Sequence, residues 1–208
     1  MRLKTLLLSL SFLLTAGVIY GCAESVAGQD TEAAAAGADV TVDDSSFRCL
    51  SDMTKVRHFF VDNLLGDLDS TVAVAESTEG GVYPPGSVVQ LVPTEVMVKH
   101  QPGWNAATRD WEFFELDVSP EGTSIRKRGF NEVVNRFGGN CFDCHVKAEP
   151  QWDLICDNFH GCDPIPLTRS LVSTIQKTDP RCEPSELNEE DMANMKILKA
   201  MMGGASGS

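Results

Sequence analysis

Basic residues are scarce in this chain. Its 208 residues include 17 Lys and Arg against 30 Asp and Glu, which gives a net charge of −13. A surface of this sign repels phosphate groups, so it argues against nucleic acid as a partner and against electrostatic binding to anionic lipid. It is compatible with a basic redox partner protein, although a merely solvated acidic surface is the simpler interpretation.

Long apolar runs are also lacking. The longest, Leu6 to Tyr20, is too short for a comfortable membrane span and follows two basic residues, so it predicts a signal peptide over residues 1–21. The cleavage region Ile19-Tyr20-Gly21-Cys22 resembles a bacterial lipobox, with a simple secretory signal as the alternative. We therefore expect lipid attachment at Cys22, which would anchor the protein to a membrane without spanning it. By analogy with bacterial lipoproteins, Ala23 after the cysteine favours the periplasmic face of the outer membrane over the inner membrane.

Aromatic residues are absent between Ala23 and Ser46, where Ala, Gly, Ser, Thr and acidic residues dominate. Such a segment buries too little apolar surface to offset the loss of chain entropy, so residues 22–46 are predicted to form a flexible acidic tether. Residues 203–208 are predicted to be disordered for the same reason. The remaining residues, 47–202, have no internal repeat and suit one domain of ordinary size.

The residues Cys141–His145 read Cys-Phe-Asp-Cys-His, the C-x-x-C-H signal for covalent attachment of a c-type haem. Two thiols three residues apart reach the two vinyl groups of one porphyrin, and the next imidazole binds iron as the proximal ligand. We therefore predict one haem c, attached at Cys141 and Cys144, with His145 as the metal ligand. The alternatives are an ordinary disulfide and a zinc site that uses Cys141, Cys144, His160 and Cys162.

Four further cysteines remain once Cys22 is assigned to lipid and two cysteines are assigned to haem. An even number in an oxidising compartment predicts two disulfides. Cys156 with Cys162 would close a small loop and leave Cys49 with Cys182. The pairing of Cys162 with Cys182 and of Cys49 with Cys156 fits the sequence equally well.

The pattern of apolar residues predicts an α+β fold with an N-terminal helix, an antiparallel sheet of four to five strands, the late haem loop and C-terminal helices. The predicted helices are Phe47–Leu65, Phe130–Phe137, Leu167–Gln176 and Asn188–Met202. The predicted strands are Ser70–Ser77, Ser87–Val92, Glu95–His100, Asp110–Val118 and Thr123–Gly129.

The late position of the C-x-x-C-H motif, after a region rich in strands, resembles the cytochrome P-460 and cytochrome c′-beta family. The segments that carry the resemblance are Tyr83–Val89, Glu95–Lys99, Asp110–Phe114 and Asn140–His145. The resemblance implies a mostly antiparallel β domain that holds one high-spin haem with an open distal side, and a dimer is compatible with it. Members of the family oxidise hydroxylamine or bind nitric oxide.

The same resemblance implies two further kinds of site residue. Members that oxidise hydroxylamine carry a lysine bonded to the porphyrin, and members use a distal carboxylate as a base. The strand Ser87–Val92 has no lysine, so Lys99 and Lys127 are the candidates for a cross-link. Glu121 and Glu132 are the candidates for the carboxylate by position.

The sixth coordination position of the iron separates two functions. An open position allows iron to bind small ligands, whereas a side chain in that position leaves only electron transfer. The candidates for such a side chain are His58, His100, His160, Met53 and Met97. The sequence therefore predicts a membrane-anchored monohaem cytochrome that binds or oxidises nitric oxide or hydroxylamine, with a six-coordinate electron carrier as the alternative.

Overall fold

The computed structural model describes residues 37–136 and 138–204, with side chains up to Met201. The predicted signal peptide, Cys22 and the first part of the predicted tether lie outside the described residues, as do Phe137 and the tail from residue 205. None of the described helices is long and apolar enough to cross a membrane.

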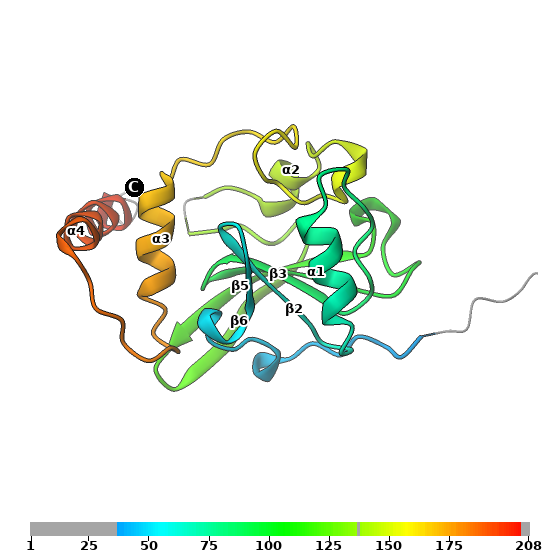
Figure 1. The fold of residues 1–208 in the computed structure, drawn as a ribbon, viewed down its shortest axis with the longest axis horizontal. Coiled ribbons are helices and arrows are strands. Elements are labelled where there is room, and N and C mark those ends of the chain that lie inside the picture. Colours follow the sequence, from blue (N-terminus) through cyan, green and yellow to red (C-terminus); the bar gives the residue numbers. More distant parts are fainter. Residues whose placement is uncertain (1–36, 137, 205–208) are drawn as a thin grey trace, which may run out of the picture. The chain divides into compact units, whose positions relative to one another are not determined.

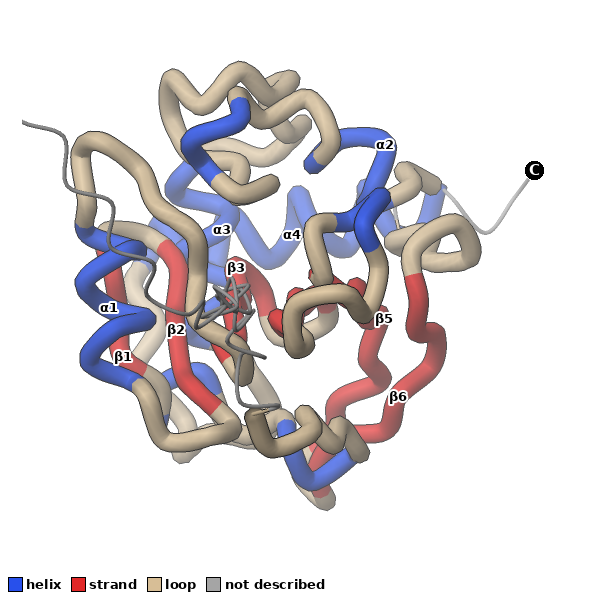
Figure 2. Tube along the Cα trace, turned by 90° about the vertical axis from the view of Figure 1, so that its right-hand side faces the viewer, coloured by secondary structure: helices blue, strands red, loops and turns tan. Residues whose placement is uncertain are grey.

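Six strands form one antiparallel sheet in which each strand pairs with the next along the chain (Figures 1 and 2). Their bounds are Thr54–Val56 for β1, Phe59–Asn63 for β2, Ser87–Val92 for β3, Glu95–Lys99 for β4, Trp111–Ser119 for β5 and Gly122–Gly129 for β6. Figure 2 shows β1 and β2 on one side of the molecule and β5 and β6 on the other, as this order requires. The α+β class is confirmed, and the sheet has six strands rather than four or five.

In the part of the chain that the structure describes, four α-helices and four short 3₁₀ turns accompany the sheet. The α-helices are Leu68–Glu76 (α1), Cys141–His145 (α2), Arg169–Lys177 (α3) and Glu189–Gly204 (α4). The 3₁₀ turns are Asp44–Ser46, Leu50–Asp52, Ala106–Thr108 and Pro150–Trp152. Figure 1 shows α3 and α4 side by side, and both confirm predicted helices.

The central strands are buried on both faces, so apolar residues run almost continuously along them. One face carries Val61, Val89, Met97, Trp111 and Phe113, and it packs against α1 and α2. We call it the motif face. The opposite face carries Phe60, Val88, Val96, Val98, Phe114 and Leu116, and residues 40–53 cover it.

The N-terminal helix predicted over Phe47–Leu65 is wrong. This stretch forms a 3₁₀ turn and the strands β1 and β2, which meet at a turn where Arg57 has a φ of 53°. Phe59 and Val61 face one apolar cluster while Phe60 faces the other. A strand buried on both faces has consecutive apolar residues. Some of these residues are three or four apart, so the sequence also matches the pattern of a helix.

The strand predicted over Ser70–Ser77 is also wrong, because α1 occupies this stretch. Leu68, Thr71, Val72 and Ala75 have the spacing i, i+3, i+4, i+7 of one helix face. Thr71 and Ala75 are buried, and Leu68 and Val72 pack against the core. The alternation of valines that suggested a strand is a local feature within this longer helical pattern.

Two other expectations differ from the structure. Residues 130–136 are not helical; the segment contains a single bridge between Val134 and Asn140, and Val133 is buried. The packed unit starts at residue 37 rather than residue 47. Val40 and Val42 are buried in the cluster on the opposite face, so the end of the predicted tether belongs to the domain.

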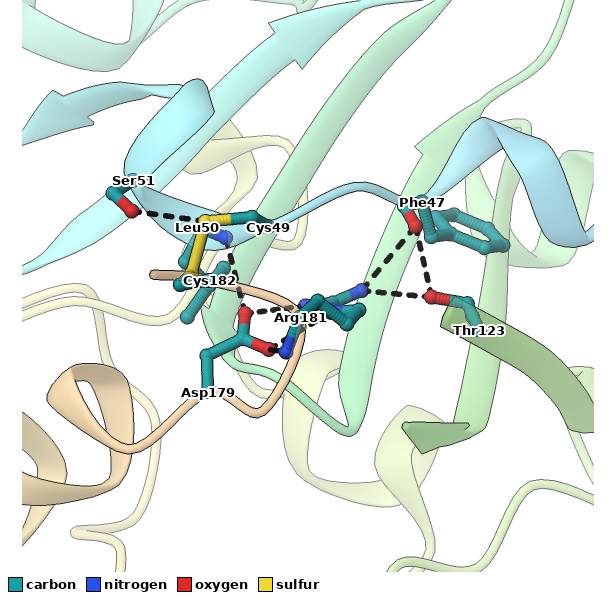
Figure 3. Close-up of a disulfide and its surroundings, with 8 residues drawn as sticks. All are labelled: Phe47, Cys49, Leu50, Ser51, Thr123, Asp179, Arg181 and Cys182. Carbon is teal, nitrogen blue, oxygen red and sulfur yellow. Dashed lines mark hydrogen bonds and ion pairs between the residues drawn. A yellow bond between two sulfur atoms is a disulfide. The ribbon is translucent and has the colours of Figure 1, made fainter. Parts of the chain in front are cut away.

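A disulfide between Cys49 and Cys182 joins the N-terminal segment to the segment between α3 and α4 (Figure 3). Beside it, Asp179 accepts a hydrogen bond from the backbone N–H of Leu50 at 3.0 Å. Asp179 also forms an ion pair with Arg181 at 2.8 Å, and both side chains are buried. A covalent bond and a satisfied buried ion pair thus hold the C-terminal helices to the start of the domain.

Candidate functional site

The C-x-x-C-H motif folds as the single-turn helix α2. Asn140 caps it, since its side-chain oxygen accepts a hydrogen bond from the backbone N–H of Asp143 at 3.0 Å. The amide of Asn140 donates in turn to the carbonyl of Asn131 at 2.9 Å. Cys141 and Cys144 are one turn apart, half-buried, and not joined to each other or to another cysteine. The motif therefore presents two thiols from one rigid turn.

His145 is oriented by a hydrogen bond from its ring. Its Nδ1 lies 2.7 Å from the carbonyl oxygen of Leu154, and because a carbonyl only accepts, Nδ1 carries the proton. The lone pair of the neutral ring then lies on Nε2, which is the atom available to a metal. Burial lowers the pKa of His145, which favours this neutral form.

Phe113 and Phe142 pack around the motif. The ring of His145 meets the ring of Phe113 edge to face at 5.3 Å between centroids. Phe142 packs against Phe113 at 6.1 Å and against Phe130 at 5.8 Å. These aromatic contacts give His145 an apolar surrounding and attach α2 to the motif face.

The motif face beneath α2 has an apolar middle and ionisable ends. Strands β4 and β5 pair Met97 with Phe113 in the middle of this face. At one end Lys99 pairs with Trp111, and at the other end Glu95 pairs with Glu115. Since side chains alternate along a strand, Glu95, Met97 and Lys99 form one row on this face.

The carboxylate end of the motif face lies near Cys141. Glu115 is fully buried and forms ion pairs with Arg126 at 3.1 Å and with Arg136 at 3.2 Å. Burial and the charge of Glu115 raise the pKa of Glu95 to about 7. Burial, together with the two glutamates, raises the pKa of Cys141 to about 12. Cys141 is therefore a thiol rather than a thiolate at neutral pH.

At the lysine end of the motif face, Lys99 is also buried and paired with an opposite charge. Lys99 is 4% exposed, and its ammonium lies 2.8 and 2.9 Å from the two carboxylate oxygens of Asp153. It also donates to the carbonyl of Arg109 at 2.6 Å. Lys99 therefore lies on the motif face, but its ammonium is engaged in an ion pair with Asp153.

The other candidates that the family resemblance suggested lie on the surface. Lys127 on β6, Glu121 in the β5–β6 turn and Glu132 are all exposed. A hydrogen bond from Ser119 lowers the pKa of Glu121, which does not suit a proton acceptor at neutral pH. The carboxylates on the motif face are the half-buried Glu95 and the fully buried Glu115, which the sequence analysis missed. Their alternation with Met97 and Phe113 on paired strands is the signal that identifies them.

The candidate sixth ligands are dispersed. Met97 lies on the motif face within the apolar cluster that Cys141 and Phe142 also contact. Met53 belongs to the cluster on the opposite face. His100 contacts Glu112 through Nε2 at 2.8 Å, and Glu112 binds Arg128. The structure thus brings Met97 to the motif and does not bring Met53 there.

The remaining candidates, His58 and His160, each contact neighbouring residues of the protein. His58 lies 3.3 Å from Asp157, and burial lowers the pKa of His58. His160 is buried, stacks on Trp152 at 3.8 Å and contacts the carbonyl of Ile155 through Nδ1 at 2.7 Å. Its Nδ1 is therefore occupied.

The cysteine pairing follows the first of the two alternatives, with Cys49 bonded to Cys182 and Cys156 bonded to Cys162. The zinc site proposed with Cys162 is wrong, since a disulfide sulfur is not a thiolate ligand. Throughout the described residues, no three His, Cys, Asp or Glu side chains gather as a metal site.

Comparison of the chain with protein-family models, with curated proteins and with solved structures found no match. The donor set itself fits a covalently held haem. Two unpaired thiols stand one helical turn apart, an imidazole with Nε2 as its lone-pair atom follows directly, and aromatic rings pack against them. The residues that would hold this group are Cys141, Cys144 and His145.

Proposed function

We propose that the domain carries one haem c, with thioether bonds at Cys141 and Cys144 and with His145 as the axial ligand. The observation that carries this proposal is the 2.7 Å hydrogen bond from His145 to the carbonyl of Leu154. It leaves Nε2 as the metal-binding atom directly beside two unpaired thiols. The other four described cysteines are consumed in disulfides, so this pair is set apart from the structural ones.

The chain would contribute two points of attachment and the orientation of the imidazole. The thiols of Cys141 and Cys144 would each add S–H across one vinyl group, forming a C–S bond and a C–H bond with no need for an oxidant. His145 provides its Nε2 lone pair, and Phe113 limits the tilt of the imidazole. When bound, haem would supply a redox-active iron that can bind a small molecule.

We propose further that the domain is of the P-460 and c′-beta type and binds nitric oxide or a molecule of similar size. The support is the order of the elements, an antiparallel sheet followed by the motif. Lys99 is engaged with Asp153 and Lys127 is exposed, which favours ligand binding over oxidation of hydroxylamine through a lysine cross-link. A lipid anchor at Cys22 would place the domain at the cell envelope, with the outer membrane favoured.

One observation favours the alternative of a six-coordinate electron carrier. Met97 is 5% exposed on the motif face and shares an apolar cluster with Cys141. A methionine thioether is the usual second ligand of electron-transfer cytochromes c. The ferric visible spectrum decides between the two functions, because high-spin and low-spin iron have different bands.

The test of haem attachment is expression of the full chain together with haem maturation machinery. We expect a red protein whose mass increases by one haem and whose pyridine haemochrome spectrum is that of a c-type haem. The double variant Cys141→Ser/Cys144→Ser should lose the covalent haem. The matched control Cys156→Ser/Cys162→Ser also removes two sulfurs and should retain it. A colourless wild-type protein would refute the proposal.

The test of ligand binding uses the same preparation. We expect a high-spin ferric spectrum and a ferrous form whose spectrum changes on addition of nitric oxide. A red-shifted ferrous Soret band would instead indicate a lysine cross-link. A low-spin ferric spectrum together with no response to nitric oxide would support electron transfer and contradict the ligand-binding function.

A further inference from the structure

The ion pair between Lys99 and Asp153 is buried, and every N–H donor of the Lys99 ammonium is used within the protein. Both side chains are nearly fully buried, at 6% and 3% exposed. The three hydrogen bonds of the ammonium go to the two oxygens of Asp153 and to the carbonyl of Arg109. An ammonium has three donors, so all are used. The pair is therefore a fixed connection between β4 and the loop that follows the 3₁₀ turn Pro150–Trp152.

The loop that this pair holds has an unfavourable backbone conformation. Asp153 has a φ of 49° and Leu154 a φ of 66°. Two consecutive residues with side chains in the left-handed region cost about 1 kcal/mol or more each, so their surroundings must impose the conformation. Asp153 accepts a second hydrogen bond from the backbone N–H of Tyr83 at 3.0 Å, and Leu154 is 2% exposed in the core.

The result of this conformation is the direction of one carbonyl group. The carbonyl of Leu154 points at His145 and accepts its Nδ1–H at 2.7 Å. Without the anchor at Asp153, the loop would be free to relax to ordinary dihedral angles, and this carbonyl would turn away. The outer contacts of a metal-binding histidine fix its tautomer and raise its strength as a ligand.

We propose that Lys99 and Asp153 are positioning residues for His145, acting through the strained turn at Asp153 and Leu154. The inference rests on the proposed function, because the orientation of Nε2 has a chemical consequence only where iron binds there. The pair strengthens the bond between iron and His145 and thereby stabilises the ferric state relative to the ferrous state. The family resemblance suggested Lys99 as a residue that bonds to the porphyrin. In this proposal Lys99 instead orients the proximal ligand His145.

The test compares the double variant Lys99→Met/Asp153→Asn with the wild type. The two changes leave the net charge unaltered and avoid a buried unpaired charge, which removal of one partner would create. Asn tolerates a positive φ, so the substitution adds no strain of its own to the turn, and a change at His145 reports the loss of the ion pair. We expect the iron–histidine stretching band of the ferrous protein, measured by resonance Raman, to shift to lower frequency. The reduction potential should become more positive.

Lys147→Met is the matched control. Lys147 is exposed, pairs with Asp163 and lies two residues from His145. Its substitution removes a lysine near the motif without touching the turn, so the iron–histidine band should stay at the wild-type frequency. A folded double variant that carries haem and has the wild-type band and potential would overturn the proposal.

The positioning role of Lys99 and Asp153 can also be tested if the matured wild-type protein carries no haem. That result refutes the proposed function, and the same variants are then compared by long-range ¹⁵N–¹H NMR of His145 at pH 8. Positioning predicts that Nδ1 is protonated in the wild type and in Lys147→Met, and that the double variant has a mixture of tautomers. An unchanged Nδ1 tautomer in the double variant would overturn the positioning role separately.

Discussion

Glu95 and Glu115 lie directly opposite each other on the neighbouring strands β4 and β5. The two side chains share one face of the sheet, and burial raises the pKa of each of them. Two carboxylates so close together do not both ionise without cost, so the pair holds a proton to a higher pH than an isolated glutamate does. Arg126 and Arg136 contact Glu115, which makes Glu95 the residue that keeps the proton.

The stability of the domain should therefore fall as pH rises through the range in which Glu95 titrates. Its pKa rises from 4.5 to about 7 on folding, so the folded state binds more protons than the unfolded state between these values. The free energy of unfolding is then expected to decrease by about 3 kcal/mol from this group as pH rises from about 4.5 to about 8, and most of this loss occurs below pH 7.

The variant Glu95→Gln isolates this effect. Urea unfolding at pH 5 and at pH 8 should give a smaller difference in midpoint for Glu95→Gln than for the wild type. Glu186→Gln, which changes an exposed glutamate, is the control and should keep the wild-type difference. Equal pH dependence in all three proteins would show that Glu95 is not the group responsible.

The substitution Met97→Leu distinguishes an open sixth position from one that a thioether fills. Leucine has a similar volume, so the cost in stability should stay below about 1.5 kcal/mol. For the ligand-binding function we expect identical high-spin ferric spectra for the wild type and Met97→Leu. Met53→Leu, on the opposite face, controls for the loss of a buried sulfur. A low-spin wild type that becomes high-spin only in Met97→Leu would identify Met97 as a ligand.

The two disulfides should differ in their contribution to stability. Cys49 and Cys182 are 133 residues apart in sequence, whereas Cys156 and Cys162 are 6 apart. The chain-entropy model gives about 5 kcal/mol for the long loop and about 2 kcal/mol for the short one. Chemical denaturation of the two double serine variants should reproduce this order. A larger loss for the Cys156→Ser/Cys162→Ser protein would contradict the entropic explanation.

The ion pair beside the long disulfide should matter more than an ion pair on the surface (Figure 3). Asp179→Ala leaves the buried Arg181 unpaired and removes the acceptor of the Leu50 N–H, so we expect a loss of about 3 kcal/mol. Asp163→Ala removes the exposed partner of Lys147 and should cost less than about 1 kcal/mol. Thermal unfolding of both variants provides the comparison, and equal losses would contradict it.

Short-range patterns in the sequence predicted the second half of the sheet well. A tight turn at Pro93 joins β3 to β4, and a tight turn at Pro120 joins β5 to β6, whereas residues 100–110 connect β4 to β5 through a longer loop. Local turn chemistry sets both the ends of these strands and their antiparallel pairing. Helices α3 and α4 were found for a similar reason, since their boundaries depend on nearby residues.

The first half of the domain, which contains β1, β2 and α1, was predicted poorly because its secondary structure depends on residues that are distant in the sequence. Phe59, Phe60 and Val61 form a strand only because β3 pairs with β2 and the two sheet faces are covered by separate segments. The roles of the site residues depend on long-range contacts in the same way. The motif Cys141–His145 is visible in five consecutive residues, whereas the partner of Lys99 lies 54 residues away at Asp153 and no spacing rule indicates it.

The separation between a local motif and its distant support has a consequence for the order of biogenesis. The cap at Asn140 and the helical turn of α2 are complete within a few consecutive residues, so an unfolded chain can already offer both sulfurs to an attachment enzyme. The hydrogen bond that orients the imidazole of His145 depends on β4 and on the loop at Asp153. These two segments come together only in the folded domain. Under the proposed function, attachment of the haem would therefore precede tertiary folding, and folding would then fix the orientation of His145.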